Sequence, residues 1–81
     1  MRYSCDKDDA GYKAWCDLAS DGRKVLVYLD GALLKDAITA DDVEGIVIHP
    51  RRTAEGNISI NPHSGEILLE TLRGKVTFEV V

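Results

Sequence analysis

Apolar residues near the start of the chain recur with the spacing of a helix. The residues that share one helical face are Tyr12, Trp15, Cys16 and Ala19. This spacing predicts a helix over residues 8–20, with Asp8 or Asp9 capping its start. Gly22 supplies the end, because glycine readily takes the left-handed conformation that closes a helix.

From residue 24 onward the pattern changes to that of short strands separated by turns. Residues 24–29 carry β-branched and aromatic side chains, and Asp30-Gly31 separates them from residues 32–34. Asp-Gly favours a type I′ turn, because both of its positions need positive φ, so the sequence predicts a hairpin here. A further strand is predicted to start at residue 46 and to end at Pro50, which has no N–H for a ladder.

Residues 57–61 alternate between polar and apolar side chains, with Ile58 and Ile60 on one face. The alternation predicts a half-buried strand. A turn over residues 61–65, with Gly65 at positive φ, then brings residues 66–72 back to pair with residues 57–61.

The chain is predicted to end in a strand over residues 75–81. Val76, Phe78 and Val80 alternate with polar residues, which places them on the core side. This strand is a candidate sheet edge, and an exposed edge either pairs with a neighbour or needs protection. Val80 and Val81, which leave the terminus apolar, are therefore candidate interface residues.

Together these segments predict a mainly β fold, a small antiparallel barrel or sandwich of five to six short strands with one N-terminal helix. An α+β arrangement is the alternative. The 81 residues allow one domain, residues 1–81, which is β-rich over 24–81. No apolar run could span a bilayer and no secretory signal is present, so we expect a soluble protein of the cytoplasm.

Charge is unevenly distributed along the chain. The net charge is −4, and all of this excess lies in residues 1–44. An acidic domain without a basic stripe is a poor nucleic-acid binder, so we expect protein partners rather than DNA or RNA. The only local basic run surrounds Arg51 and Arg52, which are candidate contact residues. The acidic half also leaves open a small regulator or inhibitor that binds a basic host protein.

Two cysteines and two histidines form the set of residues that most suggests a metal site. Cys5, Cys16, His49 and His63 form the ligand set of a structural zinc site, but they lack the close paired spacing of such sites. We therefore expect free thiols and no cofactor, and keep metal binding as an alternative. His63 and Ser64 are adjacent on a turn, which does not suit nucleophilic catalysis, so no enzyme is predicted.

The aromatic pair Tyr12 and Trp15 admits two interpretations. On the helix face these side chains would cover the open side of the sheet as part of the core. Alternatively they are exposed anchors of an interface.

Several short segments have a familiar composition. They are V-Y-L-D-G at 27–31, A-D-D-V-E-G at 40–45, G-N-I-S-I-N-P-H-S-G-E at 56–66 and R-G-K-V at 73–76. In these segments the chain resembles a small uncharacterised protein family encoded in tailed bacteriophages and prophages. The resemblance implies a phage accessory protein in the bacterial host cell or the virion, and it assigns a role to no individual residue. The prediction is a non-enzymatic module, structural or assembly-related, that acts through protein–protein contacts as a homo-oligomer or on a particle.

Overall fold

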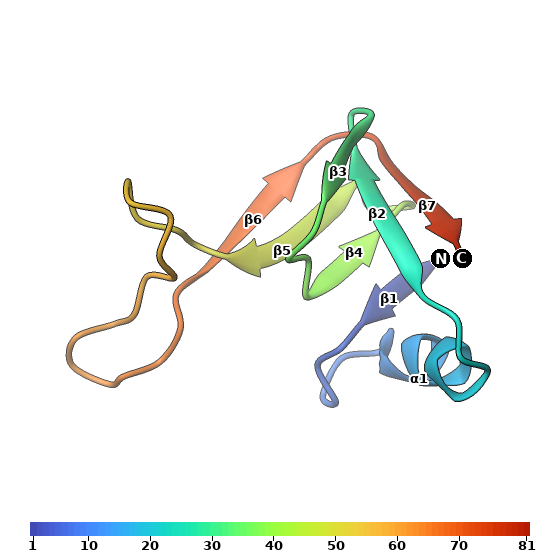
Figure 1. Ribbon diagram of the computed structural model, residues 1–81, viewed down its shortest axis with the longest axis horizontal. Coiled ribbons are helices and arrows are strands. Elements are labelled where there is room, and N and C mark those ends of the chain that lie inside the picture. The colour runs from blue at the N-terminus through green and yellow to red at the C-terminus, as the bar shows by residue number, and fades with distance from the viewer.

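The computed structural model describes residues 1–81, which form seven strands and one short helix (Figure 1). In chain order the elements are β1 (Arg2–Ser4), α1 (Tyr12–Ser20), β2 (Val25–Leu29), β3 (Ala32–Leu34), β4 (Thr39–Asp41), β5 (Ile46–Pro50), β6 (Leu69–Arg73) and β7 (Val76–Val80). The strands make two antiparallel sheets with the orders β1-β4-β5-β6 and β3-β2-β7. The predicted mainly β fold is confirmed; the sheets form a sandwich-like arrangement and do not close into a barrel.

The predicted hairpin joins β2 to β3. Asp30 and Gly31 have φ values of 50° and 85°, as a type I′ turn requires. Asp30 also fastens this hairpin to the last strand: its N–H donates to the carbonyl of Lys75, and its carboxylate accepts from the Lys75 N–H. The hairpin prediction is therefore confirmed, and its turn residue adds a contact between distant segments.

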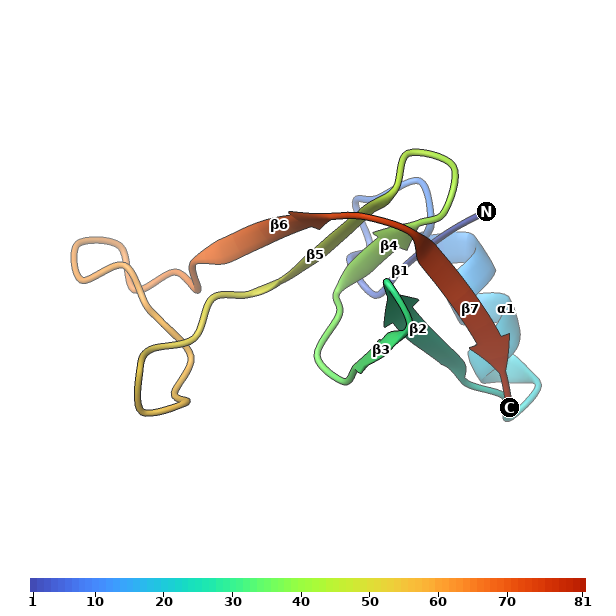
Figure 2. The same ribbon diagram turned by 90° about the horizontal axis from the view of Figure 1, so that it is seen from above.

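One bent ribbon, β6 followed by β7, belongs to both sheets (Figure 2). The Gly74 N–H donates to the carbonyl of Gly45. In β6 the main-chain N–H and carbonyl groups of the even-numbered residues therefore point toward β5. The Lys75 carbonyl accepts from the Asp30 N–H. In β7 the main-chain groups of the odd-numbered residues therefore point toward β2. The ribbon thus uses one edge in the first sheet and the other edge in the second.

The core is small and lies between the two sheets. Its four buried apolar residues are Val27, Ala40, Val47 and Val76, one each from β2, β4, β5 and β7. Phe78 packs against this cluster and Val80 is half-buried, whereas the intervening Thr77 and Glu79 are exposed. The predicted core side of the last strand is confirmed, and β7 is an edge of its sheet as expected.

The helix is shorter than predicted. It begins at Tyr12 rather than at residue 8, because Gly11 takes the N-cap position and the Asp9 carboxylate is bound by Arg2 instead of capping the helix. Its end is as predicted, with Gly22 at a φ of 71°. The helix is not long enough, or apolar enough, to cross a membrane.

The strand predicted over residues 57–61 is wrong. This segment makes only isolated bridges, Arg52 with Ile58 and Ile60 with Ile67. The side chains of Ile58 and Ile60 are 40% and 56% exposed, so no half-buried face forms. Residues 66–72 do not pair with residues 57–61 as a ladder either; β6 pairs with β5 instead.

The two additional strands, β1 and β4, bring the total above the five or six predicted. They pair with each other, Ser4 opposite Thr39, and their hydroxyl groups form a buried hydrogen bond of 2.7 Å. Because each strand is only three residues long, neither carries enough of a pattern to be recognised alone.

Candidate interaction surface

The segment between β5 and β6, residues 51–68, projects from the body of the protein, and we call it the arm (Figure 1). It consists of two loops that turn at residues 53–57 and 61–66. Figure 2 shows the arm extending away from both sheets. The molecule is accordingly elongated, with principal extents of 37, 26 and 22 Å.

Three main-chain hydrogen bonds close the base of the arm. The Arg51 N–H donates to the Leu68 carbonyl (2.8 Å), the Leu68 N–H to the Ser59 carbonyl (3.0 Å), and the Ser59 N–H to the Arg51 carbonyl (2.7 Å). We call this closed set the backbone ring. It inserts Ser59 between two residues that would otherwise bond each other directly, which is why residues 57–61 cannot form a regular strand.

Each loop of the arm is held by its own turn residues. In the first loop the Thr53 N–H donates to the Asn57 carbonyl (2.7 Å). In the second, the side-chain oxygen of Asn61 accepts from the His63 N–H and the Asn61 carbonyl accepts from Gly65, whose φ is 72°. The predicted turn over residues 61–65 is confirmed. These bonds are local, so they fix the loop shapes without burying side chains.

The arm exposes apolar side chains. Ile58 and Ile60 lie on it, Ile67 is 52% exposed at its end, and Leu69 is 54% exposed just beyond, at the start of β6. No buried core residue belongs to residues 51–68. Scattered exposed apolar residues are ordinary, but three on one projecting segment and a fourth directly beyond it make this segment a candidate contact surface.

One arginine ties the arm to the body, and its neighbour makes no side-chain bond. The Arg52 guanidinium binds the Asp36 carboxylate at 3.1 Å and the Gly56 carbonyl at 2.9 Å. The same carboxylate lies 3.9 Å from Nδ1 of His49, whose Nε2 is buried without a hydrogen-bond partner. The Arg51 side chain forms no hydrogen bond or ion pair within the chain. Of the two predicted contact residues, only Arg51 is therefore available for a partner.

The aromatic pair of the helix combines both predicted roles. Tyr12 and Trp15 stack with ring centroids 6.1 Å apart, and Trp15 is 36% exposed while it also lines a cavity between α1 and the sheets. The cavity volume is about 90 Å³ and its lining is mostly apolar, including Tyr3 and Leu34. An apolar cavity of about 150 Å³ holds benzene, and this one is smaller.

The predicted interface residues at the C-terminus are mostly used within the chain. Val80 is half-buried and lies opposite Val25 of β2. The Val81 side chain is exposed, but its N–H and carbonyl exchange hydrogen bonds with Lys24. The end of the chain is therefore paired on the β2 side.

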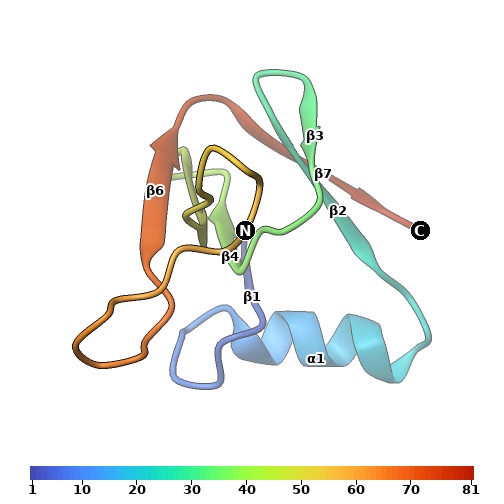
Figure 3. The ribbon, with the colours of Figure 1, turned by 60° about the vertical axis from the view of Figure 1, so that its left-hand side comes forward.

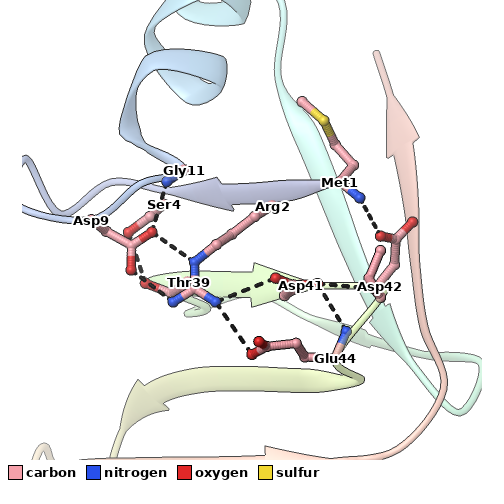
Figure 4. A network of polar contacts seen from close by, with 10 residues as sticks. Met1, Arg2, Ser4, Asp9, Gly11, Thr39, Asp41, Asp42 and Glu44 are labelled. Atoms are coloured by element: carbon pink, nitrogen blue, oxygen red, sulfur yellow. Dashed lines mark hydrogen bonds and ion pairs between the residues drawn. The ribbon is translucent and has the colours of Figure 1, made fainter.

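A polar network joins the start of the helix to two strands (Figure 4). The Arg2 guanidinium holds both carboxylate oxygens of Asp9 at 2.8 Å and one oxygen of Asp41 at 3.3 Å. Glu44 lies 3.8 Å from the same guanidinium, and the amino group of Met1 pairs with Asp42. A bidentate arginine–carboxylate pair is among the stronger polar contacts in proteins, so Arg2 fixes where the helix begins.

The electrostatics of this network suit a structural role. The hydrogen bonds from Arg2, and then that from the Gly11 N–H, lower the pKa of Asp9 to about 2. The pKa of Asp41 is also lowered, first by the backbone N–H of Glu44 and then by that of Val43 and by Arg2. Acid–base catalysis needs a pKa near the working pH, which these carboxylates do not have.

The four candidate metal ligands lie on separate elements. Cys5 follows β1, Cys16 lies on α1, His49 on β5 and His63 on the arm. No group of three His, Cys, Asp or Glu side chains is arranged to hold a metal ion. Both cysteines are free thiols, as predicted.

The apolar surface of the arm was not identified from the sequence. The alternation of Ile58 and Ile60 is the available signal, but the same alternation predicts a half-buried strand. Comparison of the chain with protein-family models, with curated proteins and with solved structures found no match.

Proposed function

We propose that the protein is a small non-enzymatic module that acts through protein–protein contacts, and that the arm carries its contact surface. The observation that supports this proposal is the exposure of Ile58, Ile60 and Ile67 on the arm, which contributes nothing to the core, and of Leu69 directly beyond it.

The energetics favour covering these side chains. Fully burying an isoleucine or leucine side chain is worth about 1.5–3 kcal/mol, and each of the four retains about half of that value because it is about half exposed. A partner that covers all four therefore gains several kcal/mol, which offsets part of the cost of association. Arg51, at the base of the arm, adds an unpaired cation that a partner carboxylate can bind.

The resemblance over residues 27–80 adds a biological setting to the proposal. It implies a phage or prophage accessory whose contacts serve a particle or its assembly in the bacterial host. A projecting arm on a small body suits this role, because it reaches a neighbouring subunit without rearranging the sheets.

The acidic-regulator alternative needs unpaired carboxylates to present to a basic partner. Part of the acidic half is already engaged within the chain: Asp9 and Asp41 are bound by Arg2, Asp42 by the chain amino group, and Asp36 by Arg52. The exposed carboxylates of this half that make neither an ion pair nor a hydrogen bond are those of Asp8, Asp17 and Asp21.

Site-specific photocrosslinking tests the proposal. A photoreactive phenylalanine analogue is placed at Ile60 on the arm, and in a separate variant at Val43, which is 83% exposed in the turn before β5, at its other end from the arm. In bacterial cells that express the protein, we expect covalent protein adducts from position 60 and none from position 43. Adducts that form equally at both positions, or at neither, would contradict the proposal.

A further inference from the structure

The outer edge of β6 carries a row of main-chain groups without partners. The backbone ring and the Gly74–Gly45 bond show that the main-chain N–H and carbonyl groups of residues 68, 70, 72 and 74 point toward β5. The N–H and carbonyl groups of Leu69, Thr71 and Arg73 therefore point away from β5. No strand lies beyond β6 in its sheet, and none of these groups bonds elsewhere in the chain (Figure 3).

The other sheet edges are shorter, covered, or carry more deeply buried side chains. Beyond β1, the Ser4 N–H donates to the carbonyl of Gly11, so the loop before the helix covers that edge. The edge strand β3 has only three residues. β7 is as long as β6, and the main-chain groups of Val76, Phe78 and Val80 on its outer side also lack partners in the chain. The two edges differ in their side chains: Val76 is buried and Phe78 and Val80 are half-buried, whereas Leu69, Thr71 and Arg73 of β6 are all exposed. The edge of β6 therefore presents exposed side chains as well as free main-chain groups to a second strand.

We infer that β6 pairs antiparallel with β6 of a second copy of this chain, which joins two four-stranded sheets into one continuous sheet. The inference goes beyond the proposed function, because the pairing uses the edge of β6 and not the arm. Its basis is the self-complementary spacing of the free groups. With a twofold axis at Thr71, Leu69 of one copy lies opposite Arg73 of the other, and the two Thr71 residues face each other. Every free N–H and carbonyl of the row then has a partner.

Side chains favour this register over its neighbour. A shift of the twofold axis to Glu70 places two glutamates directly opposite each other, and like charges in that position destabilise a sheet. With the axis at Thr71, two threonines are opposed, which is a favourable cross-strand pair. Leu69, about half exposed in the single chain, packs along the aliphatic part of Arg73 from the second copy.

The closed arrangement also limits the size of the assembly. An antiparallel pairing about a twofold axis is isologous, so each copy uses its β6 edge once. The expected product is a dimer. Main-chain hydrogen bonds and apolar contacts dominate its interface, so its mass is expected to be the same at low and high salt.

The first test is the absolute mass in solution, by light scattering behind a sizing column, of the unmodified chain and two variants. The unmodified chain is expected at twice 8.9 kDa. Thr71→Lys opposes two ammonium groups across the axis and is expected to weaken the dimer about tenfold or more. The matched control is Thr77→Lys, at an exposed strand position of β7 that faces β2, and it is expected to leave the dimer intact.

A cysteine crosslink tests the register itself. In a background carrying Cys5→Ser and Cys16→Ser, Thr71→Cys is expected to form a covalent dimer on oxidation, whereas Thr77→Cys is not. Circular dichroism of each variant verifies that the fold is retained. A monomeric unmodified chain overturns the inference, and so does a dimer that Thr71→Lys leaves unchanged. If the chain is monomeric but position 60 still crosslinks to another protein, self-pairing is refuted while the contact function of the arm stands.

Discussion

Removal of the arm tests whether the body of the protein folds independently of it. Arg51 and Leu68 face each other in the register of β5 and β6, and their N–H···O bond already joins the two strands. A two-residue type I′ turn suits such a pair, so residues 52–67 can be replaced by Asn-Gly. The Arg51 carbonyl and the Leu68 N–H, which now bond Ser59, can then bond each other.

The expected change in stability follows from two opposing terms. Shortening the loop about eightfold reduces its closure entropy by about 1.8 kcal/mol. The deletion loses the exposed ion pair between Arg52 and Asp36, worth about 0–1 kcal/mol. No core residue is removed, since Val27, Ala40, Val47 and Val76 all lie outside the arm. The free energy of unfolding should therefore rise by about 1 kcal/mol.

Urea denaturation followed by the fluorescence of Trp15, the single tryptophan, measures this change. Trp15 lies on α1, away from the arm, so its signal reports on the body in both proteins. A loss of more than about 1 kcal/mol, or a transition that is no longer cooperative, would show that the arm packs on the body and would refute the reasoning.

Three further predictions concern the body, each measured by urea denaturation. Val47→Ala removes two methyl groups from a fully buried site and should cost about 2–3 kcal/mol, a large part of the stability of so small a core; a cost below about 1 kcal/mol would contradict the assigned core. The pKa of Asp9 is lowered on folding, so the contribution of Asp9 to the free energy of unfolding is present above pH 3.8, its usual pKa, and is lost as the pH falls toward about 2. Asp9→Asn should therefore lower stability at pH 7 and flatten the dependence of stability on acid pH. Gly11→Ala brings a Cβ to 2.9 Å from the Arg2 carbonyl and should destabilise more than Gly31→Ala, where only the positive φ opposes alanine; equal effects would argue against the close approach at Gly11.

Local signals account for the parts of the fold that the sequence predicts correctly. Asp30-Gly31 specifies its turn by backbone preference alone, and Gly22 ends the helix for the same reason. The alternation from Val76 to Val80 places the correct side chains on the core. None of these features depends on a partner distant in the sequence.

Pairing between distant segments accounts for the errors. Strands β1 and β4 are short and exist because they pair with each other, which no local pattern reveals. The alternation of Ile58 and Ile60 specifies that they share a face, but not that another element covers it, and the backbone ring prevents a ladder there. The helix starts later than its pattern predicts because Asp9 binds Arg2, a contact between the loop before the helix and β1.

The same distinction applies to the candidate surface. Arg51 and Arg52 look equivalent in the sequence, yet only Arg52 forms an ion pair with Asp36. Likewise the chemistry of two cysteines and two histidines is visible in the sequence, whereas their separation onto different elements is visible only in the structure. Residue type indicates what a side chain can bind, and tertiary position decides whether it is free to do so.

The backbone ring has a consequence for how this protein can change over evolutionary time. Its three bonds use only main-chain atoms of Arg51, Ser59 and Leu68, so they constrain no side chain in either loop. The loops can therefore acquire new residues, and with them new binding preferences, while the joint to the body is preserved. Under the proposed function, recognition and folding fall to different stretches of one short chain, and each can adapt without disturbing the other.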